Sequence, residues 1–373
     1  MSLLFRLVAR EMLGPFLFGL GAFTILFFAV ETLTGVARMV LESKLGLGLI
    51  AEYLANRLPQ VIIFTCPMAV LLSGLMSFGR LSSDSELTAL KAAGISFMRI
   101  ATPALLLCAL VSCINLWLND SLVPGSMKRA YDIVFEAQKR DPFRYALGTP
   151  PRTLKNGETQ ILCVYGFDVD RKILYGVYLH YFYNEARRRD IFAEQAVWNG
   201  RVWVLKNMRV TTFDNQMDAT QELTASETWT EMQPGDSPSD PNALIRREYL
   251  PEELSRAELA EKLAELPAGK VVGGDANRKR NRYEVMFHQK LALPWTSLIF
   301  GAFAIPLGVR PQRSSRSIGL GLSLLFILIY YVLMTVGMVL GEAGKMPAMH
   351  AAWFPNIVFG VMGLLLLLEA TRK

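Results

Sequence analysis

The sequence predicts an α-helical membrane protein with six transmembrane helices and an inserted, all-β, jelly-roll-like domain that lies outside the membrane. Two observations lead to this fold class. Three membrane-length runs without Asp, Glu, Lys or Arg stand near each end of the chain. The long segment between them changes to the two-residue alternation of β-strands. Two membrane halves should therefore flank one β-domain.

Each uncharged run is long enough to cross a bilayer, because a transmembrane helix needs about 20 apolar residues at a rise of about 1.5 Å each. Buried helices of soluble proteins seldom reach this length without a charge. The first run follows Arg6 and Arg10, as in a signal peptide, but it is long and no small-residue cleavage site follows Val30, so we expect a retained helix. The six runs are 12–30, 58–79, 100–119, 291–309, 317–341 and 346–368.

Basic residues in the short loops predict that both termini are cytoplasmic. One basic cluster before the fourth run, 278–282, falls on the opposite side, and we interpret it as a solvated flank or as an anchor for anionic headgroups. The predicted cytoplasmic basic residues are Arg6, Arg10, Arg80, Lys91, Arg99, Arg310, Arg313, Arg316, Arg372 and Lys373.

The middle segment, 123–283, contains short strand-like runs and ends with a helix. Asn-Gly pairs at 156–157 and 199–200 stand between β-prone runs, and this pair favours a type I′ hairpin turn. Repeated strands at this spacing predict a sandwich or jelly roll. The amphipathic helix at 251–266 carries Leu259, Leu263 and Leu266 on one face, and Ser255 with Glu258 fits a capping box.

The sequence offers no catalytic arrangement. Its three histidines lack metal-ligand spacing, Cys163 is alone in the middle segment, and a phosphate-binding GxxxxGK[ST] loop is absent. The turn at FDVDRK resembles a tight turn more than a calcium loop. We therefore predict no enzyme activity, no metal and no cofactor, and a transport role would need energy from a separate protein.

A short polar stretch, SSDSELTALKAAGIS at 82–96, interrupts the membrane runs. Ser83 and Glu86 fit a capping box, so a helix over 83–95 is expected, with Leu87 and Leu90 on one face and Gly94 at its end. Two interpretations are equally favoured. The helix docks into a groove of a soluble partner, or it lies flat on lipid headgroups.

Two membrane motifs resemble the LptF/LptG permeases of the lipopolysaccharide export system. One is LSSDSELTALKAAGIS followed by PALLL, and the other is HQKLALPWTSLIFGAFAIPLGVRPQRSSRSIGLGLSLLFILIYYVL at 288–333. The order of parts also matches: three spans, a β-domain and three spans. The resemblance implies a domain division into a membrane half (1–122), a periplasmic β-domain (123–283) and a second membrane half (284–373).

The resemblance also implies partners in the inner membrane and on both sides of it. These are a cytoplasmic ABC ATPase dimer, a second permease subunit that makes a homo- or heteromeric pair, periplasmic jelly-roll bridge proteins, and lipopolysaccharide as the substrate. The ATPase-coupling residues would be Asp84, Glu86, Leu87, Leu90 and Lys91. The substrate and lateral-gate residues, on spans one and five, would be Glu31, Thr34, Arg38, Gly321, Leu324 and Ile327.

Small residues on spans one and five fit close helix packing. They are Gly14, Gly19, Gly21, Ser317, Gly319, Gly321 and Ser323. One position departs from the family pattern, because Glu31 stands where a basic residue is expected and a carboxylate repels lipid phosphate; Arg38 is expected to take that role. The alternative to a permease is a membrane scaffold that presents the β-domain for protein contacts, and it needs no docking helix.

Overall fold

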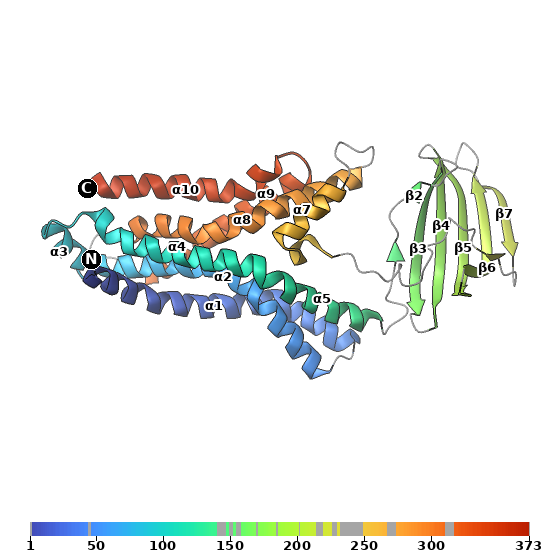
Figure 1. Ribbon diagram of the computed structural model, residues 1–373, viewed down its shortest axis with the longest axis horizontal. Coiled ribbons are helices and arrows are strands. Elements are labelled where there is room, and N and C mark those ends of the chain that lie inside the picture. The colour runs from blue at the N-terminus through green and yellow to red at the C-terminus, as the bar shows by residue number, and fades with distance from the viewer. Residues whose placement is uncertain are drawn as a thin grey trace. The chain divides into compact units, whose positions relative to one another are not determined.

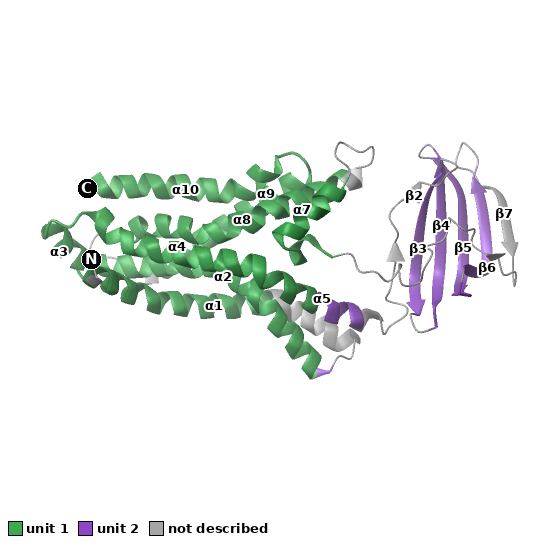
Figure 2. Ribbon diagram, in the orientation of Figure 1, with its two compact units in different colours: residues 1–37, 47–130, 249–373 green, residues 38–46, 131–248 purple. Residues whose placement is uncertain are grey.

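The computed structural model of the chain forms two compact units, which are described separately (Figure 2). Unit 1 comprises residues 1–37, 47–130 and 249–373, and unit 2 comprises residues 38–46 and 131–248. The structure describes residues 2–43, 46–139, 147–148, 152–153, 158–168, 171–183, 186–200, 202–213, 219–225, 230–231, 249–266, 274–309 and 317–372.

Unit 1 is a bundle of long helices that run side by side (Figure 1). Its elements are α1 (Ser2–Ser43), α2 (Leu47–Ser83), α3 (Glu86–Ala92), α4 (Phe97–Ser121), the first half of α5 (Val123–Lys139), the 3-10 helix η2 (Pro251–Glu253), α7 (Arg256–Glu265), α8 (Gly274–Gly308), α9 (Ser317–Glu342) and α10 (Ala348–Arg372). Pro124 and Gly125 follow the end of α4, as predicted, but they lie in the first turn of α5, where proline is tolerated.

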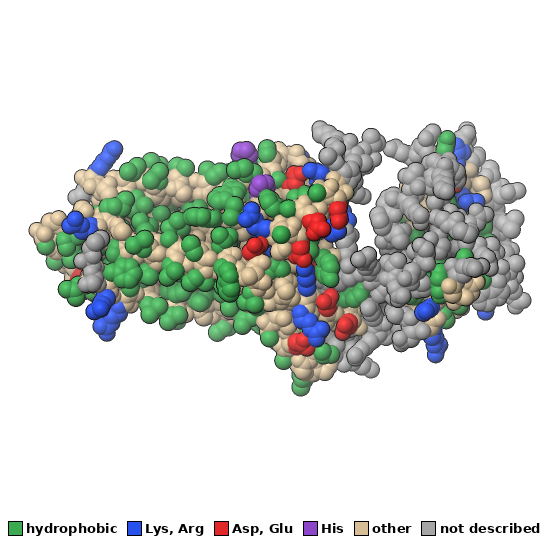
Figure 3. All heavy atoms as spheres, viewed as in Figure 1, with side chains coloured by type: hydrophobic (Ala, Val, Ile, Leu, Met, Phe, Trp, Pro, Cys, Tyr) green, Lys and Arg blue, Asp and Glu red, His purple; other side chains and the backbone are tan. Residues whose placement is uncertain are grey.

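Six of the described helices, α1, α2, α4, α8, α9 and α10, are long and apolar enough to cross a membrane, in the places that the sequence predicted. Hydrophobic side chains cover the middle of the visible face of the bundle, and charged side chains gather towards its two ends (Figure 3). The most apolar windows of α2 and α8 are 83% and 67% buried, whereas those of α1 and α9 are 11% and 22% buried. Thus α2 and α8 form the centre, and α1 and α9 lie at the periphery.

Glycines allow close helix approaches in the bundle. A Cβ on Gly74 of α2 would lie 2.7 Å from the side chain of Ala304 of α8, and a Cβ on Gly337 of α9 would lie 2.5 Å from the carbonyl oxygen of Ala351. No larger residue fits at either place without moving a helix. Small residues at such contacts are the usual way in which membrane helices gain van der Waals packing.

A buried polar network joins α8, α9 and α10. The Tyr330 hydroxyl donates to Asn356 Oδ1 at 2.9 Å, and the Thr296 hydroxyl donates to the same oxygen at 3.0 Å. Asn356 Nδ2 in turn donates to the carbonyl oxygen of Ala292 at 2.7 Å. Because all three side chains are buried, each bond replaces water that an apolar bundle excludes.

Replacing Asn356 by Leu should destabilise the bundle by about 1–3 kcal/mol, because the carbonyl of Ala292 and two hydroxyls lose a partner. We expect a lower midpoint of thermal unfolding of the full-length protein in detergent. Thr335→Val is the matched control, because Thr335 is exposed and its hydroxyl donates within its own helix to Tyr331. Equal midpoints for both variants would contradict a structural role of the network.

Unit 2 contains an antiparallel sheet. Its strands are β1 (Leu147–Gly148), β2 (Arg152–Thr153), β3 (Thr159–Asp168), β4 (Ile173–Tyr183), β5 (Ala186–Trp198), β6 (Trp203–Phe213), β7 (Ala219–Ala225) and β8 (Thr230–Glu231). The order is β1-β3-β4-β5-β6-β7, with β2 paired to β3 and β8 paired to β6. The predicted inserted β-domain is therefore present, and its jelly-roll topology stays a prediction.

The alternation of buried and half-buried side chains along β4 agrees with the predicted two-residue period. Val177, Leu179 and Tyr181 are buried in one core cluster with Trp203, whereas the residues between them are half-buried. The hairpin predicted at Asn199-Gly200 joins β5 to β6, but its type I′ turn is wrong. Within this pair, Gly200 has positive φ and Asn199 does not; the Asn199 side chain accepts the backbone N–H of Val202, and the ladder closes at Trp198 and Trp203. The second predicted hairpin, at 156–157, lies outside the described residues.

Candidate functional site

The predicted docking helix, α3, joins α2 to α4 at one end of the bundle. Leu87 is 3% exposed, and Leu90 packs beside it against the buried cluster that contains Phe97. Asp84 is exposed, whereas Glu86 and Lys91 are half-buried. Leu87 therefore anchors α3 to the bundle, which changes the contact role predicted for it, and the polar residues provide the accessible surface.

The start of α3 differs from the prediction. Ser83 belongs to the last turn of α2, where its hydroxyl donates to the carbonyl oxygen of Arg80 at 3.0 Å. The capping residue is Ser85, in the left-handed conformation with φ 60°, and it makes no side-chain capping bond. The Ser83–Glu86 capping box is thus wrong, and α3 spans Glu86–Ala92 rather than 83–95.

The end of α3 agrees with the prediction for Gly94. Its φ is +83°, its N–H donates to the carbonyl oxygen of Lys91 at 2.9 Å, and the N–H of Ile95 donates to that of Leu90 at 3.1 Å. These two bonds form a Schellman motif, which needs a left-handed residue that glycine adopts without strain. The chain therefore turns sharply from α3 into α4.

Polar contacts attach the peripheral helix α1 to α2. Ser73 and Ser77 donate their hydroxyls to the backbone carbonyls of Met12 and Glu11, at 2.7 and 2.9 Å. The Glu11 carboxylate forms an ion pair with Arg80, which also lies 3.9 Å from the carboxylate of Asp84. Arg80 thus links α1 to the loop that precedes α3.

The predicted substrate and gate residues lie on α1 and α9. Glu31, Thr34 and Arg38 fall within α1, and their side chains are outside the described part of the structure. On α9, Leu324 is 43% exposed, whereas Ile327 is 8% exposed and packs in the bundle core. Only Leu324 of these two presents its side chain to the outside of the chain.

The predicted close packing of small residues occurs within this chain at Gly19 but not at three other glycines. A Cβ on Gly19 would lie 2.9 Å from the Leu72 side chain, so α1 approaches α2 closely there. Nothing lies within 4 Å of a Cβ at Gly14, Gly21 or Gly321. Gly321 therefore faces open space on α9, and helix contact within this chain does not require a glycine there.

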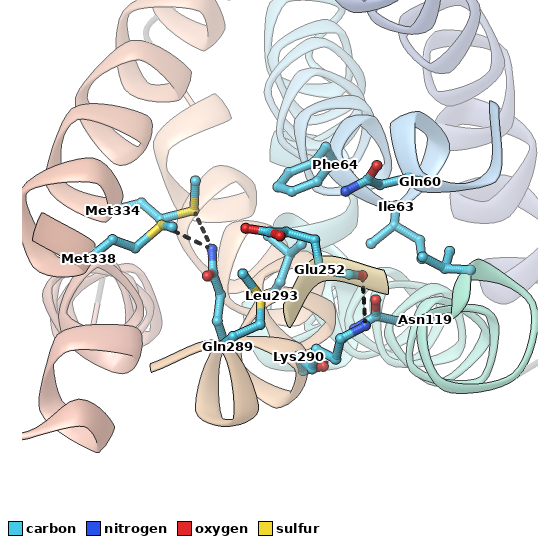
Figure 4. A pocket seen from close by; sticks show the side chains of 12 residues that line it. Gln60, Ile63, Phe64, Asn119, Glu252, Gln289, Lys290, Leu293, Met334 and Met338 are labelled. Atoms are coloured by element: carbon cyan, nitrogen blue, oxygen red, sulfur yellow. Dashed lines mark hydrogen bonds between the residues drawn. The ribbon is translucent and has the colours of Figure 1, made fainter. Parts of the chain in front are cut away.

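A pocket of about 160 Å³ lies at the end of the bundle opposite α3. Side chains from different elements converge on it, among them Gln60, Asn119, Glu252 and Gln289 (Figure 4). Lys290 is 5% exposed, and its ammonium donates to the backbone oxygen of Glu252 at 3.4 Å. Within the described part of the chain, the buried Oε1 of Gln289 and Oε2 of Glu252 have no hydrogen-bond partner.

Sequence reasoning missed this pocket. Gln289 and Lys290 stand directly before the uncharged run at 291–309, so a polar pair inside a membrane-length helix was visible as a signal. Their partners Glu252 and Asn119 come from distant parts of the chain, and no sequence pattern connects them. Most of its lining is apolar, but several polar side chains meet there and the pocket is large enough for water, which would satisfy the unpaired oxygens.

An ion pair at the same end of the bundle holds α7 against α5. The Glu258 carboxylate pairs with Lys128 and completes the predicted capping box, accepting the N–H of Ser255 at 2.8 Å. Burial raises the pKa of the Glu258 carboxyl, but the hydrogen bonds from Lys128 and Ser255 outweigh burial and hold that pKa below its ordinary value. Leu259 of the same helix is fully buried, as predicted.

The ion pair of Glu258 should make stability depend on pH. Because its pKa is lower in the folded protein, the contribution is complete above the ordinary glutamate pKa of about 4.3 and is lost as the pH falls through the lowered value. The group is partly exposed, so we expect less than about 1 kcal/mol. Thermal unfolding of Glu258→Gln from pH 7 to pH 3 should therefore approach that of the unchanged protein at the acidic end.

Glu261→Gln is the control for this measurement, because Glu261 is exposed on the same helix. Glutamine keeps the capping box of Ser255, so the substitution at Glu258 isolates the charge. A constant difference in midpoint between Glu258→Gln and the unchanged protein at every pH would contradict the assignment.

The fold and these features define a multi-pass membrane protein with an inserted antiparallel β-domain. The family described as "Lipopolysaccharide export system permease LptF/LptG" matches residues 6–369, so the chain belongs to that family, as its membrane motifs predicted. Members are lipopolysaccharide export permeases that work in a transport complex with other subunits, so the chain is a multi-pass inner-membrane protein of transporter type. No curated protein matches it.

Proposed function

We propose that the chain is the permease subunit of an ABC-type exporter that extracts lipopolysaccharide from the outer leaflet of the inner membrane. The observation that carries this proposal is the family match, which covers both membrane halves and the segment between them. A cytoplasmic ATPase dimer supplies the energy, and a second permease subunit, identical or related, completes the membrane pair. Periplasmic jelly-roll bridge proteins then receive the lipid.

The docking element for the ATPase is α3, through Asp84, Glu86, Leu90 and Lys91. Two structural features support this role: the helix is short and tightly ended, and Leu87 fixes it to the bundle while its polar side chains stay accessible. A fixed helix with an acidic first turn presents both an ordered surface and a charge that is favourable at a helix N-terminus.

Glu86→Lys should weaken co-purification of the ATPase by at least about tenfold, because it reverses the charge at the contact and at the helix N-terminus. Glu261→Lys is the matched control, since it makes the same substitution at an exposed glutamate of α7, at the other end of the bundle (Figure 1). Normal co-purification and transport with Glu86→Lys would remove α3 from the contact.

Both termini and α3 are cytoplasmic in this proposal. Residues 1–122 and 284–373 form the two membrane halves, and residues 123–283 form a periplasmic jelly-roll domain with a C-terminal amphipathic helix. The basic residues of the short loops support this orientation. The antiparallel sheet of unit 2, with its own buried core, suits a domain that joins a bridge of similar domains.

The lateral gate is formed by α1 and α9 in this proposal. These two helices have the least buried apolar windows, and hydroxyl bonds rather than extensive burial attach α1 to α2. Arg38 near the end of α1 is the expected partner of lipid phosphates, with Thr34 beside it and Glu31 as a repelling neighbour. Leu324 is the gate residue of α9 whose exposure suits contact with the lipid.

A photocrosslinking amino acid at Leu324 should capture lipopolysaccharide in the assembled transporter, whereas one at the buried Ile327 should capture several-fold less. The two positions share a helix, so the comparison isolates exposure. A crosslinker at Arg38 should also capture the lipid. Equal capture at both α9 positions would contradict the gate, and failure to isolate any ATPase or lipid with the chain would favour the scaffold alternative.

A further inference from the structure

A second apolar cavity, separate from the pocket of Figure 4, lies between α1, α2 and α4. Its volume is about 480 Å³, and Val70 and Ser73 of α2 form its floor. Leu13 of α1 and Leu110 of α4, each 57% exposed, stand on its two walls. The remaining lining residues are Ala9, Arg10, Met12, Phe16, Leu107, Cys108 and Val111.

The lining offers almost no open polar group. The Ser73 hydroxyl already donates to the carbonyl oxygen of Met12, so it needs no hydrogen-bond partner from a ligand. The same bond helps to fix the floor against one wall, and the bond from Asn115 Nδ2 to the carbonyl oxygen of Ile63 fixes α4 to α2. The cavity is therefore a groove between two helices that are each held separately to a third.

One end of the groove is strongly basic. Arg10 lines it, and Arg6 lies four residues earlier on the same side of α1. The adjacent carboxylate of Glu11 is engaged by Arg80. In the described part of the chain, neither Arg6 nor Arg10 makes an ion pair, and both are exposed, so their charge remains available to an outside anion.

The groove is thus complementary to an amphiphile in shape and in charge. Cations stand at one end of α1, and apolar side chains continue to Phe16, about 9 Å further along the helix axis at about 1.5 Å per residue. An unfilled groove beside lipid would lose the dispersion contacts of its lining. A guanidinium binds a phosphate through two parallel hydrogen bonds.

We propose that this groove binds an anionic phospholipid, with one acyl chain between α1 and α4 and the phosphate at Arg10 and Arg6. The lipid lies beside α1, the least buried of the spans, and fills the space that α1 leaves towards α4. It therefore supports α1 on a side where the chain itself provides few contacts. The site does not depend on the ATPase or on the transported substrate.

Native mass spectrometry of the purified full-length protein tests this site with phosphatidylglycerol and phosphatidylcholine of identical acyl chains. Phosphatidylglycerol should bind more tightly. Arg10→Gln should weaken it about fivefold, equivalent to about 1 kcal/mol for one basic residue, and should leave phosphatidylcholine unchanged. Arg372→Gln, an exposed arginine in the last turn of α10, is the control and should change neither.

Ala9→Phe tests the apolar part, because Ala9 is a half-buried wall residue and a larger side chain fills the groove. Retention of both lipids should fall. Arg10 is exposed, so its variant remains interpretable even where Ala9→Phe lowers stability. Equal phosphatidylglycerol binding by Arg10→Gln and Arg372→Gln overturns the proposal, as does full retention of both lipids by a folded Ala9→Phe variant.

Discussion

The hydrocarbon core of a membrane offers little water, so a polar group buried between membrane helices needs a partner from the chain or from ordered water. The bundle meets this constraint at its centre. Asn356 satisfies a carbonyl of α8 and receives two hydroxyls, and Asn119 Nδ2 donates to the carbonyl oxygen of Lys290 at 2.7 Å. These bonds fix which faces of α4, α8, α9 and α10 meet, because shifting any helix would leave several groups unpaired at once.

The same constraint separates central helices from peripheral ones. Glycines let α2 approach α8 closely, and most of the apolar window of each of these two helices is buried. Helix α1 instead relies on a few directed bonds, such as those from the hydroxyls of Ser73 and Ser77 to its backbone carbonyls. A hydrogen bond between membrane helices contributes on average only about 0.6 kcal/mol. Helix α1 is therefore held by few contacts within the chain, which agrees with the lateral gate proposed for it.

Two similar motifs show when the sequence could predict a helix cap. Ser-x-x-Glu occurs at Ser83–Glu86 and at Ser255–Glu258, and only the second forms a capping box. Ser255 follows a non-helical residue, so its backbone is free to cap. Ser83 is the last residue of α2, so its backbone is helical, and its hydroxyl donates to the carbonyl oxygen of Arg80. A local motif therefore predicts a cap only where the preceding chain is not itself helical.

Sequence periodicity predicted the six spans, the strands and the apolar face of α7, since each depends on neighbours along the chain. It could not predict the burial of Leu87 or the open space at Gly321, because both depend on which helices pack together. The pocket of Figure 4, which Gln289 and Lys290 line, was not predicted for the same reason. Its residues come from α2, α4, α5, η2, α8 and α9, and only the folded bundle brings them to one place.

A β-domain inserted between two membrane halves requires that the two connecting segments lie close together. The contact between α5 and α7 satisfies this requirement. The chain leaves unit 1 after Ala130 and returns at Tyr249. Two residues before the departure, the Lys128 ammonium pairs with Glu258 and lies 5.3 Å from the centroid of the Tyr249 ring. The two connections are thus held side by side, and a domain whose ends are close can be inserted without separating the parts around it. The membrane halves can therefore share one core, while the sheet builds a core of its own around Trp203.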